Sequence, residues 1–111
     1  MDYISIDDFK KVQIKVGEIL SAEKIPETDK LLKLIVAFGE ERRQIVSGIA
    51  GYFPDPNTLV GVKCAFAYNL EPRVIRGFES QGMIMAATDE ATGTFSLLRV
   101  DTNLPSGSLV R

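Results

Sequence analysis

The sequence predicts an all-β domain folded as a small closed barrel. Five or six short stretches alternate apolar and polar residues, which is the period of a strand with one buried face. Gly, Pro, Asn and Asp residues separate these stretches, and the spacing of a long amphipathic helix is not found. Many short strands with turn residues at regular intervals are typical of a small barrel.

The totals describe one ordinary globular domain covering residues 1–111. A chain of 111 residues can bury a single core without disulfides. Hydrophobic residues make up 45% and charged residues 25%, and no apolar run approaches the roughly 18 residues of a membrane span. The acidic N-terminus lacks the basic start and apolar stretch of a signal peptide, and the chain has one cysteine. We therefore expect a cytoplasmic protein that does not enter a membrane.

Catalytic chemistry has little support. The chain contains no histidine, which excludes a Cys/His zinc site and a Ser-His-Asp triad. It has no phosphate-binding glycine-rich loop, and the acidic pairs Asp7–Asp8 and Glu40–Glu41 are accounted for by charged turns. The sequence predicts a non-enzymatic module with no catalytic residue, no cofactor and no metal.

Charge is distributed unevenly along the chain. Residues 1–29 carry a net charge of −3, residues 30–76 carry +3, and residues 77–111 carry −2. A positive middle segment can place basic groups on one face while the negative ends repel polyanions elsewhere. This distribution favours oriented binding of an anionic partner over general attraction by bulk charge.

The first elements are a helical turn and a long strand. Ser5–Lys11 begins with a capping-type serine followed by aspartates and ends with lysines, which predicts a short helix whose Phe9 fills the core. From Val12 to Val16 every second residue is apolar, so a strand is expected to start there. The apolar phase slips by one residue after Gly17, which predicts a β-bulge at that glycine.

A hairpin and a short helical insert are expected next. Leu31–Phe38 is apolar on both faces, as in a central strand or one whose outer face meets a partner. Gly39 turns the chain, and residues 42–47 return with alternating polarity. Gly48–Tyr52 is long enough for one helical turn, and residues 54–57 are expected to form a loop.

Further strands follow in the second half of the chain. Val62–Tyr68 alternates in polarity, which places Cys64 in the core. Residues 83–85 form another strand, and Phe95–Val100 is expected to be the last. Asn103–Arg111 contains Pro105 and Gly107, so we expect a tail without a long element.

Residues 69–87 contain the most informative loop. Pro72 ends the preceding strand, and two glycines permit unusual backbone angles. Arg73 and Arg76 are three residues apart and would project from one side of a helical turn, where two guanidinium groups can bind successive phosphates. The alternative interpretation is a solvated loop whose arginines pair with Glu71 or Glu79.

Five motifs in register resemble a known family, the tRNA-binding domain. This domain occurs at the C-terminus of bacterial methionyl-tRNA synthetases, as a free-standing tRNA-binding protein, and in the cytokine endothelial-monocyte-activating polypeptide. The matching motifs span essentially the whole chain: Asp8-Phe9-x-Lys11-Val12 with Val16-Gly17, Asp29-Lys30-Leu31-Leu32, Ile45-Val46-Ser47-Gly48-Ile49, Asn69-Leu70-x-Pro72-Arg73, and Ser80-x-Gly82-Met83.

The resemblance implies an OB-fold, a small Greek-key barrel with a short N-terminal helix and a short helical insert. It also implies binding to the outside corner of folded tRNA by shape, a homodimer, and an aminoacyl-tRNA synthetase as a partner. The recognition residues it implies are Lys30, Asn69, Arg73, Arg76, Ser80 and Met83. Relatives often have lysine at positions 71 or 74, where this chain has Glu71 and Val74. A second branch of the fold resembles a secretion chaperone, so protein binding is the alternative function.

Overall fold

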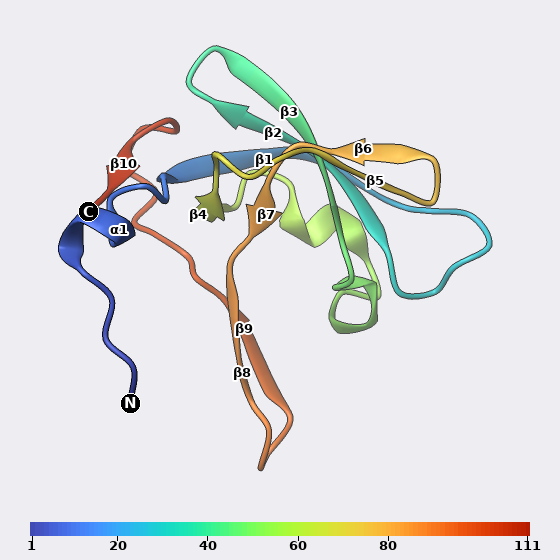
Figure 1. The fold of residues 1–111 in the computed structure, drawn as a ribbon. Helices are drawn as coiled ribbons and strands as arrows, with labels where there is room; N and C mark the ends of the chain where they lie inside the picture. The colour runs from blue at the N-terminus through green and yellow to red at the C-terminus, as the bar shows by residue number, and fades with distance from the viewer.

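The computed structural model describes all residues, Met1–Arg111, and most of its regular secondary structure consists of strands (Figure 1). The helical elements are the α-helix α1 (Ile6–Phe9) and the 3-10 turns η1 (Ala50–Tyr52) and η2 (Pro56–Leu59). The strands are β1 (Ile14–Lys24), β2 (Leu32–Phe38), β3 (Glu41–Ser47), β4 (Lys63–Ala67), β5 (Arg73–Ile75), β6 (Phe78–Ser80), β7 (Met83–Ile84), β8 (Ala86–Asp89), β9 (Thr94–Leu97) and β10 (Leu109–Val110).

One antiparallel sheet organises the molecule. Its strand order is β3-β2-β1-β4-β7, and β10 also pairs with β1. The sheet curls into a half-barrel, which confirms the all-β, barrel-like prediction (Figure 1). Two hairpins, β5–β6 and β8–β9, form separate two-stranded sheets that project from the curled sheet in different directions.

The core lies on the concave side of this sheet and contains a cluster of 14 buried residues. Leu32, Leu34 and Val36 of β2 are 0% exposed, and the strand lies between β3 and β1, so the predicted central strand is confirmed. Phe66 of β4 meets Phe38 edge-on with ring centroids 5.4 Å apart. Each such side chain stabilises the fold by about 1.5–3 kcal/mol through removal of apolar surface from water.

The predicted bulge at Gly17 is wrong. Pairing of β1 with β4 runs without a break through Gly17 and Cys64, and the register shift against β2 lies later, between Ile19 and Ser21. The apolar residues switch from one face of β1 to the other after Gly17 because both faces of this strand are covered. Val16 is 1% exposed yet lies outside the main core cluster, whereas Ile19 belongs to it.

Gly17 is required for close packing instead. A Cβ atom at this position would lie 2.5 Å from Val36 Cγ1 and 2.7 Å from the Phe66 ring. Both neighbours are core side chains that cannot move away cheaply. The glycine therefore allows two core side chains to pack directly against the backbone of β1.

The ends of the chain also differ from expectation. Phe9 is 43% exposed and does not fill the core, because α1 packs outside the sheet. The first strand starts at Ile14 rather than at Val12. The C-terminal tail forms β10, where Val110 pairs with Ile14. The loop expected at residues 54–57 leads into a second 3-10 turn, η2.

Several other expectations are confirmed. The β2–β3 hairpin, the helical turn η1 and the helix after Ser5 form as predicted, with the Ser5 hydroxyl accepting from Asp8 N at 3.0 Å. Cys64 is 0% exposed, and burial raises the pKa of its thiol to about 12. None of the helices has the length and apolar character needed to cross a bilayer.

Candidate nucleic-acid interface

The residues expected to bind a polyanion lie on and around the β5–β6 hairpin. Arg73 pairs with Ser80 across it, and Arg76 and Gly77 form its two-residue turn. Both turn residues have positive φ, 52° and 85°, as a type I′ hairpin turn requires. The predicted helical turn is therefore wrong: the two arginines are presented by an extended hairpin.

Both arginines of this hairpin are available to a ligand. Arg73 and Arg76 are exposed, and neither forms an ion pair or a side-chain hydrogen bond. The alternative in which they pair with Glu71 or Glu79 is not observed. The hairpin thus carries two free guanidinium groups, which suit the binding of phosphate oxygens.

Hydrogen bonds from β3 hold the base of the hairpin. Gln44 Nε2 donates to Glu79 O at 2.9 Å, and Gln44 N donates to Gln81 Oε1 at 3.1 Å. Ser80 is only 5% exposed; its hydroxyl accepts from Val46 N at 3.0 Å and donates to a nearby carbonyl oxygen. Ser80 is therefore placed to orient the hairpin, and its hydroxyl faces away from solvent.

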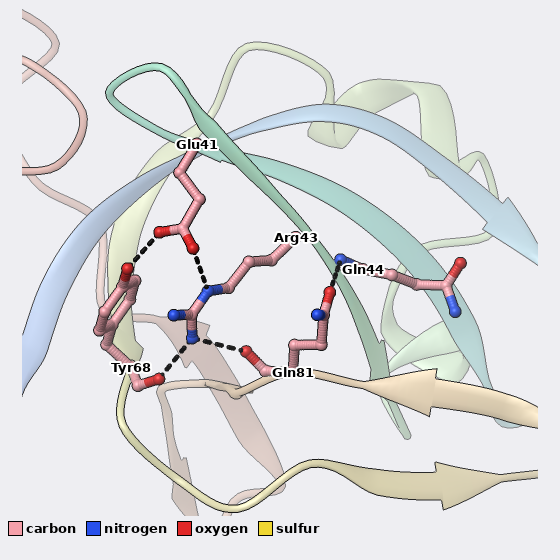
Figure 2. A network of polar contacts seen from close by, with 5 residues as sticks. All are labelled: Glu41, Arg43, Gln44, Tyr68 and Gln81. Atoms are coloured by element: carbon pink, nitrogen blue, oxygen red, sulfur yellow. Dashed lines mark hydrogen bonds and ion pairs between the residues drawn. The ribbon is translucent and has the colours of Figure 1, made fainter.

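Arg43 joins β3 to the loop that precedes the hairpin (Figure 2). Its Nη1 donates to Tyr68 O at 2.6 Å and to Gln81 O at 3.2 Å, while Nε donates to Glu41 Oε2 at 3.2 Å. Its guanidinium carbon lies 3.6 Å from the centroid of the Tyr68 ring. One partly buried side chain therefore connects the end of β4, the start of β3 and the segment after β6.

The same cluster perturbs two titrating groups. The Tyr68 hydroxyl donates to the Glu41 carboxylate, which lowers the pKa of Glu41, and the Arg43 guanidinium lowers it further. That hydrogen bond raises the pKa of Tyr68 because it favours the protonated phenol. The other face of the Tyr68 ring lies 4.1 Å from Lys15 Nζ, so the ring is held between two cations.

Asn69 connects the loop to the N-terminal segment. Its Oδ1 accepts from Gln13 N at 2.7 Å, and its Nδ2 donates to Lys11 O at 2.6 Å. Its side chain does not cap its own turn but crosses to a segment more than fifty residues away in the sequence. A shallow cavity of about 420 Å³ lies beside Asn69, with Arg43, Tyr68 and Gln81 among its lining residues.

Lys30 and Met83 flank the hairpin region differently. Met83 is 51% exposed on β7, so its side chain is available for contact rather than packed in the core. Lys30 is exposed in the turn before β2 and forms no ion pair. Lys33, further along β2, lies 5.2 Å from the centroid of the Phe78 ring in β6. The start of β2 and the hairpin therefore lie on the same side of the molecule (Figure 1).

Sequence reasoning missed three residues that shape this interface: Arg43, Gln44 and Lys33. The alternation in residues 42–47 puts Arg43 on the same face of the strand as Ile45, which is 0% exposed. A cation on a buried face needs polar partners inside the protein, so an arginine at this position was the signal in the sequence that pointed to such a network. The sequence could not identify the partners of Arg43, because they are backbone carbonyl groups from two other segments.

Comparison with protein families gives one match. Residues 14–109 match the family described as "Putative tRNA binding domain". This range begins with β1 and ends in β10, so it contains the curled sheet and both hairpins.

Individual relatives agree with this match. Methionine–tRNA ligase of Caldanaerobacter subterraneus is 52% identical over 99% of this chain, and that of Methanocaldococcus jannaschii is 49% identical over all of it. The chain spans only 17% of the length of each of these curated relatives.

Two kinds of solved structure share the fold. A MetRS-related protein from Pyrococcus horikoshii has a TM-score of 0.93 and 46% identity, with all of both chains covered. The chaperone CsaA from Bacillus anthracis has a TM-score of 0.86 and 25% identity, covering 99% of this chain and 100% of that one.

Proposed function

The chain belongs to the family of putative tRNA-binding domains, and on that premise we propose that it binds folded tRNA through the β5–β6 hairpin. The observation that carries this proposal is that two arginines without ion-pair partners, Arg73 and Arg76, lie on a hairpin that is hydrogen-bonded to β3. Free guanidinium groups on a rigid support can bind phosphates at fixed spacing. Such an array recognises the shape of a folded RNA backbone rather than its base sequence.

Within this proposal the six predicted residues have two kinds of role. Arg73, Arg76, Lys30 and Met83 are exposed, and we assign them to direct contact with the outside corner of tRNA. Ser80 and Asn69 are assigned to positioning, since their side chains are already bonded to backbone groups. Glu71 and Val74, beside these residues, add no cation to the proposed contact surface.

We assign the module an accessory, non-catalytic role. It would act either in trans or as part of a methionyl-tRNA synthetase, because the relatives named above are methionine–tRNA ligases of which it matches a minor portion. Holding tRNA would raise its local concentration at a catalytic site on other residues. The proposed place of action is the cytoplasm, together with the other components of aminoacylation.

A homodimer is also proposed, with its contact on α1 and β10 rather than on the outer face of β2. The outer face of β2 offers little exposed apolar surface, because Ala37 is 8% exposed and the strand lies inside the sheet. Apolar side chains are exposed instead on α1 and β10, where Ile6 is 65% and Leu109 50% exposed. These two elements line a cavity of about 740 Å³ that could accept the same surface of a second copy.

Sedimentation can test this contact. A species of 12.2 kDa at micromolar concentration would contradict the dimer. Ile6→Asp places a charge in the proposed apolar contact, and we expect it to convert a dimer to a monomer without unfolding the chain. Val74→Asp, at another exposed apolar position on the hairpin, should leave the dimer intact.

Retention of labelled RNA tests the proposed function directly. We expect folded tRNA to be retained, and the same tRNA after heat denaturation or an unstructured RNA of equal length to be retained much less. Equal retention of all three would refute shape recognition.

The structural likeness to the chaperone CsaA supports one alternative, binding of unfolded protein. That alternative predicts suppression of aggregation of a denatured protein and no retention of folded tRNA.

A further inference from the structure

An exposed pair of stacked aromatic rings lies outside the interface described above. Tyr52, at the end of η1, stacks on Phe95 of β9 with ring centroids 3.9 Å apart and planes inclined by 7°. Tyr52 is nevertheless 50% exposed, so the face of its ring away from Phe95 is open to solvent. An open aromatic face of this kind is the surface on which an unpaired nucleobase stacks.

The stacked pair is held rigidly before any ligand binds. Tyr52 N donates to Ile49 O at 3.0 Å, and Phe53 N donates to Ala50 O at 3.1 Å, which fixes the 3-10 turn. Phe53 meets the edge of Phe95 with centroids 6.0 Å apart and planes inclined by 76°. A preformed ring surface loses little conformational entropy when a base stacks on it.

A small cavity of about 230 Å³ adjoins the rings and has an unusual composition for this acidic chain. Its six lining residues include one cation, Arg99, and no acidic residue. Arg99 is exposed, and its side chain forms no ion pair or hydrogen bond. A flat apolar surface beside a free guanidinium group complements a planar base attached to a phosphate. An aliphatic side chain of a protein ligand could pack on the rings but would provide no anion for Arg99.

The location of the stacked pair connects it to the proposed tRNA interface. Ala50 N donates to Lys30 O at 3.1 Å, so the turn that carries Tyr52 is bonded to the turn that carries Lys30. We infer that the Tyr52–Phe95 stack and Arg99 form a second RNA site that binds one unpaired nucleotide, with the base on Tyr52 and the phosphate at Arg99. This inference rests on the proposed function, which holds the RNA nearby. The site alone is weak, because a single stacked base contributes little affinity.

A short fluorescent oligonucleotide tests this site separately from tRNA binding. The probe is a single-stranded RNA tetranucleotide containing 2-aminopurine, whose fluorescence is quenched when the base stacks on an aromatic ring. We expect saturable quenching with the wild-type protein and upfield shifts of the Tyr52 ring resonances in NMR spectra. Tyr52→Ala should weaken binding about five- to 150-fold, and Tyr52→Phe should preserve it. Arg99→Ala should reduce the slope of log affinity against log salt by about 0.7.

The outcomes separate this site from the hairpin. Unchanged affinity in Tyr52→Ala would overturn the inference, as would equal losses in Tyr52→Ala and Arg76→Ala. The NMR shifts are measured on the wild type, so they remain decisive if Tyr52→Ala unfolds; unmoved Tyr52 resonances would overturn the inference. If an aromatic peptide shifts the Tyr52 resonances and the tetranucleotide does not, the surface binds a protein partner, and this result would also overturn the inference.

Failure of the two proposals can be told apart. Retention of folded tRNA without a tetranucleotide signal would refute the nucleotide site alone. A Tyr52-dependent tetranucleotide signal without tRNA retention would support the nucleotide site and refute the hairpin interface.

Discussion

Arg43→Ala should destabilise the protein by about 3 kcal/mol. The substitution removes two hydrogen bonds from a charged donor, at 2.6 and 3.2 Å, to the carbonyl oxygens of Tyr68 and Gln81. Hydrogen bonds that involve a charged group contribute about 1.5–3 kcal/mol each. We use the lower end of that range for each bond, because the Arg43 side chain is 19% exposed and water can partly satisfy the two carbonyl oxygens after the substitution. The stability of the whole domain is only about 5–15 kcal/mol, so the loss should be measured easily.

Arg42→Ala is the matched control for this change. Arg42 precedes Arg43 in β3, carries the same charge, is exposed and has no ion-pair partner. It should cost less than about 0.5 kcal/mol. Arg43→Lys keeps the charge but loses the planar fork, so we expect it to resemble Arg43→Ala more than the wild type.

Urea unfolding followed by circular dichroism measures these differences. For a slope of about 1–3 kcal/mol/M, the midpoint for Arg43→Ala should fall by about 1–3 M. Faster hydrogen exchange at the Gln81 amide, which donates to Gln44 O at 2.8 Å, should accompany the loss. Equal midpoints for Arg43→Ala and Arg42→Ala would refute the conclusion that Arg43 holds the loop in place.

Three further predictions follow from other contacts. Arg76→Ala should flatten the plot of log tRNA affinity against log salt by about 0.7–0.9, whereas Arg111→Ala, at the opposite end of the molecule, should not (Figure 1). Gly17→Ala should destabilise the fold by about 1–3 kcal/mol in urea unfolding, because its Cβ would overlap two core side chains, while Gly51→Ala, with open space around it, should be tolerated. Tyr68→Phe removes the hydroxyl whose hydrogen bond lowers the pKa of Glu41 below 4.5. The variant should therefore be less stable than the wild type above pH 4.5, and this difference in stability should shrink as the pH falls through the lowered pKa of Glu41. A difference that grows toward acid pH would contradict that assignment.

The sequence by itself determined the strand pattern and the family. The sequence predicted that Leu31–Phe38 is a central strand covered on both faces, and alternation grouped Leu32, Leu34 and Val36 on one of them, because the side-chain period of a strand is a local property. The burial of Cys64 followed from the same alternation in β4. The five motifs pointed to the tRNA-binding domain family, which the match over residues 14–109 shows.

Tertiary structure alone decided how the loop residues are used. Arg76 and Gly77 form a type I′ turn because β5 and β6 pair, a fact that the spacing of the two arginines could not reveal. Gly17 resembled a bulge in sequence, yet its role is set by Val36 and Phe66, which come from other strands.

The hydrogen bonds of Ser80, Asn69 and Arg43 show the same dependence. Each side chain binds backbone groups 25 to 58 residues away in the sequence. Backbone carbonyl and amide groups are identical in every residue, so no sequence pattern can identify which of them a side chain meets. Local periodicity therefore determines which residues share a face of a strand, and only the folded chain determines which polar side chains support the interface and which remain free to bind.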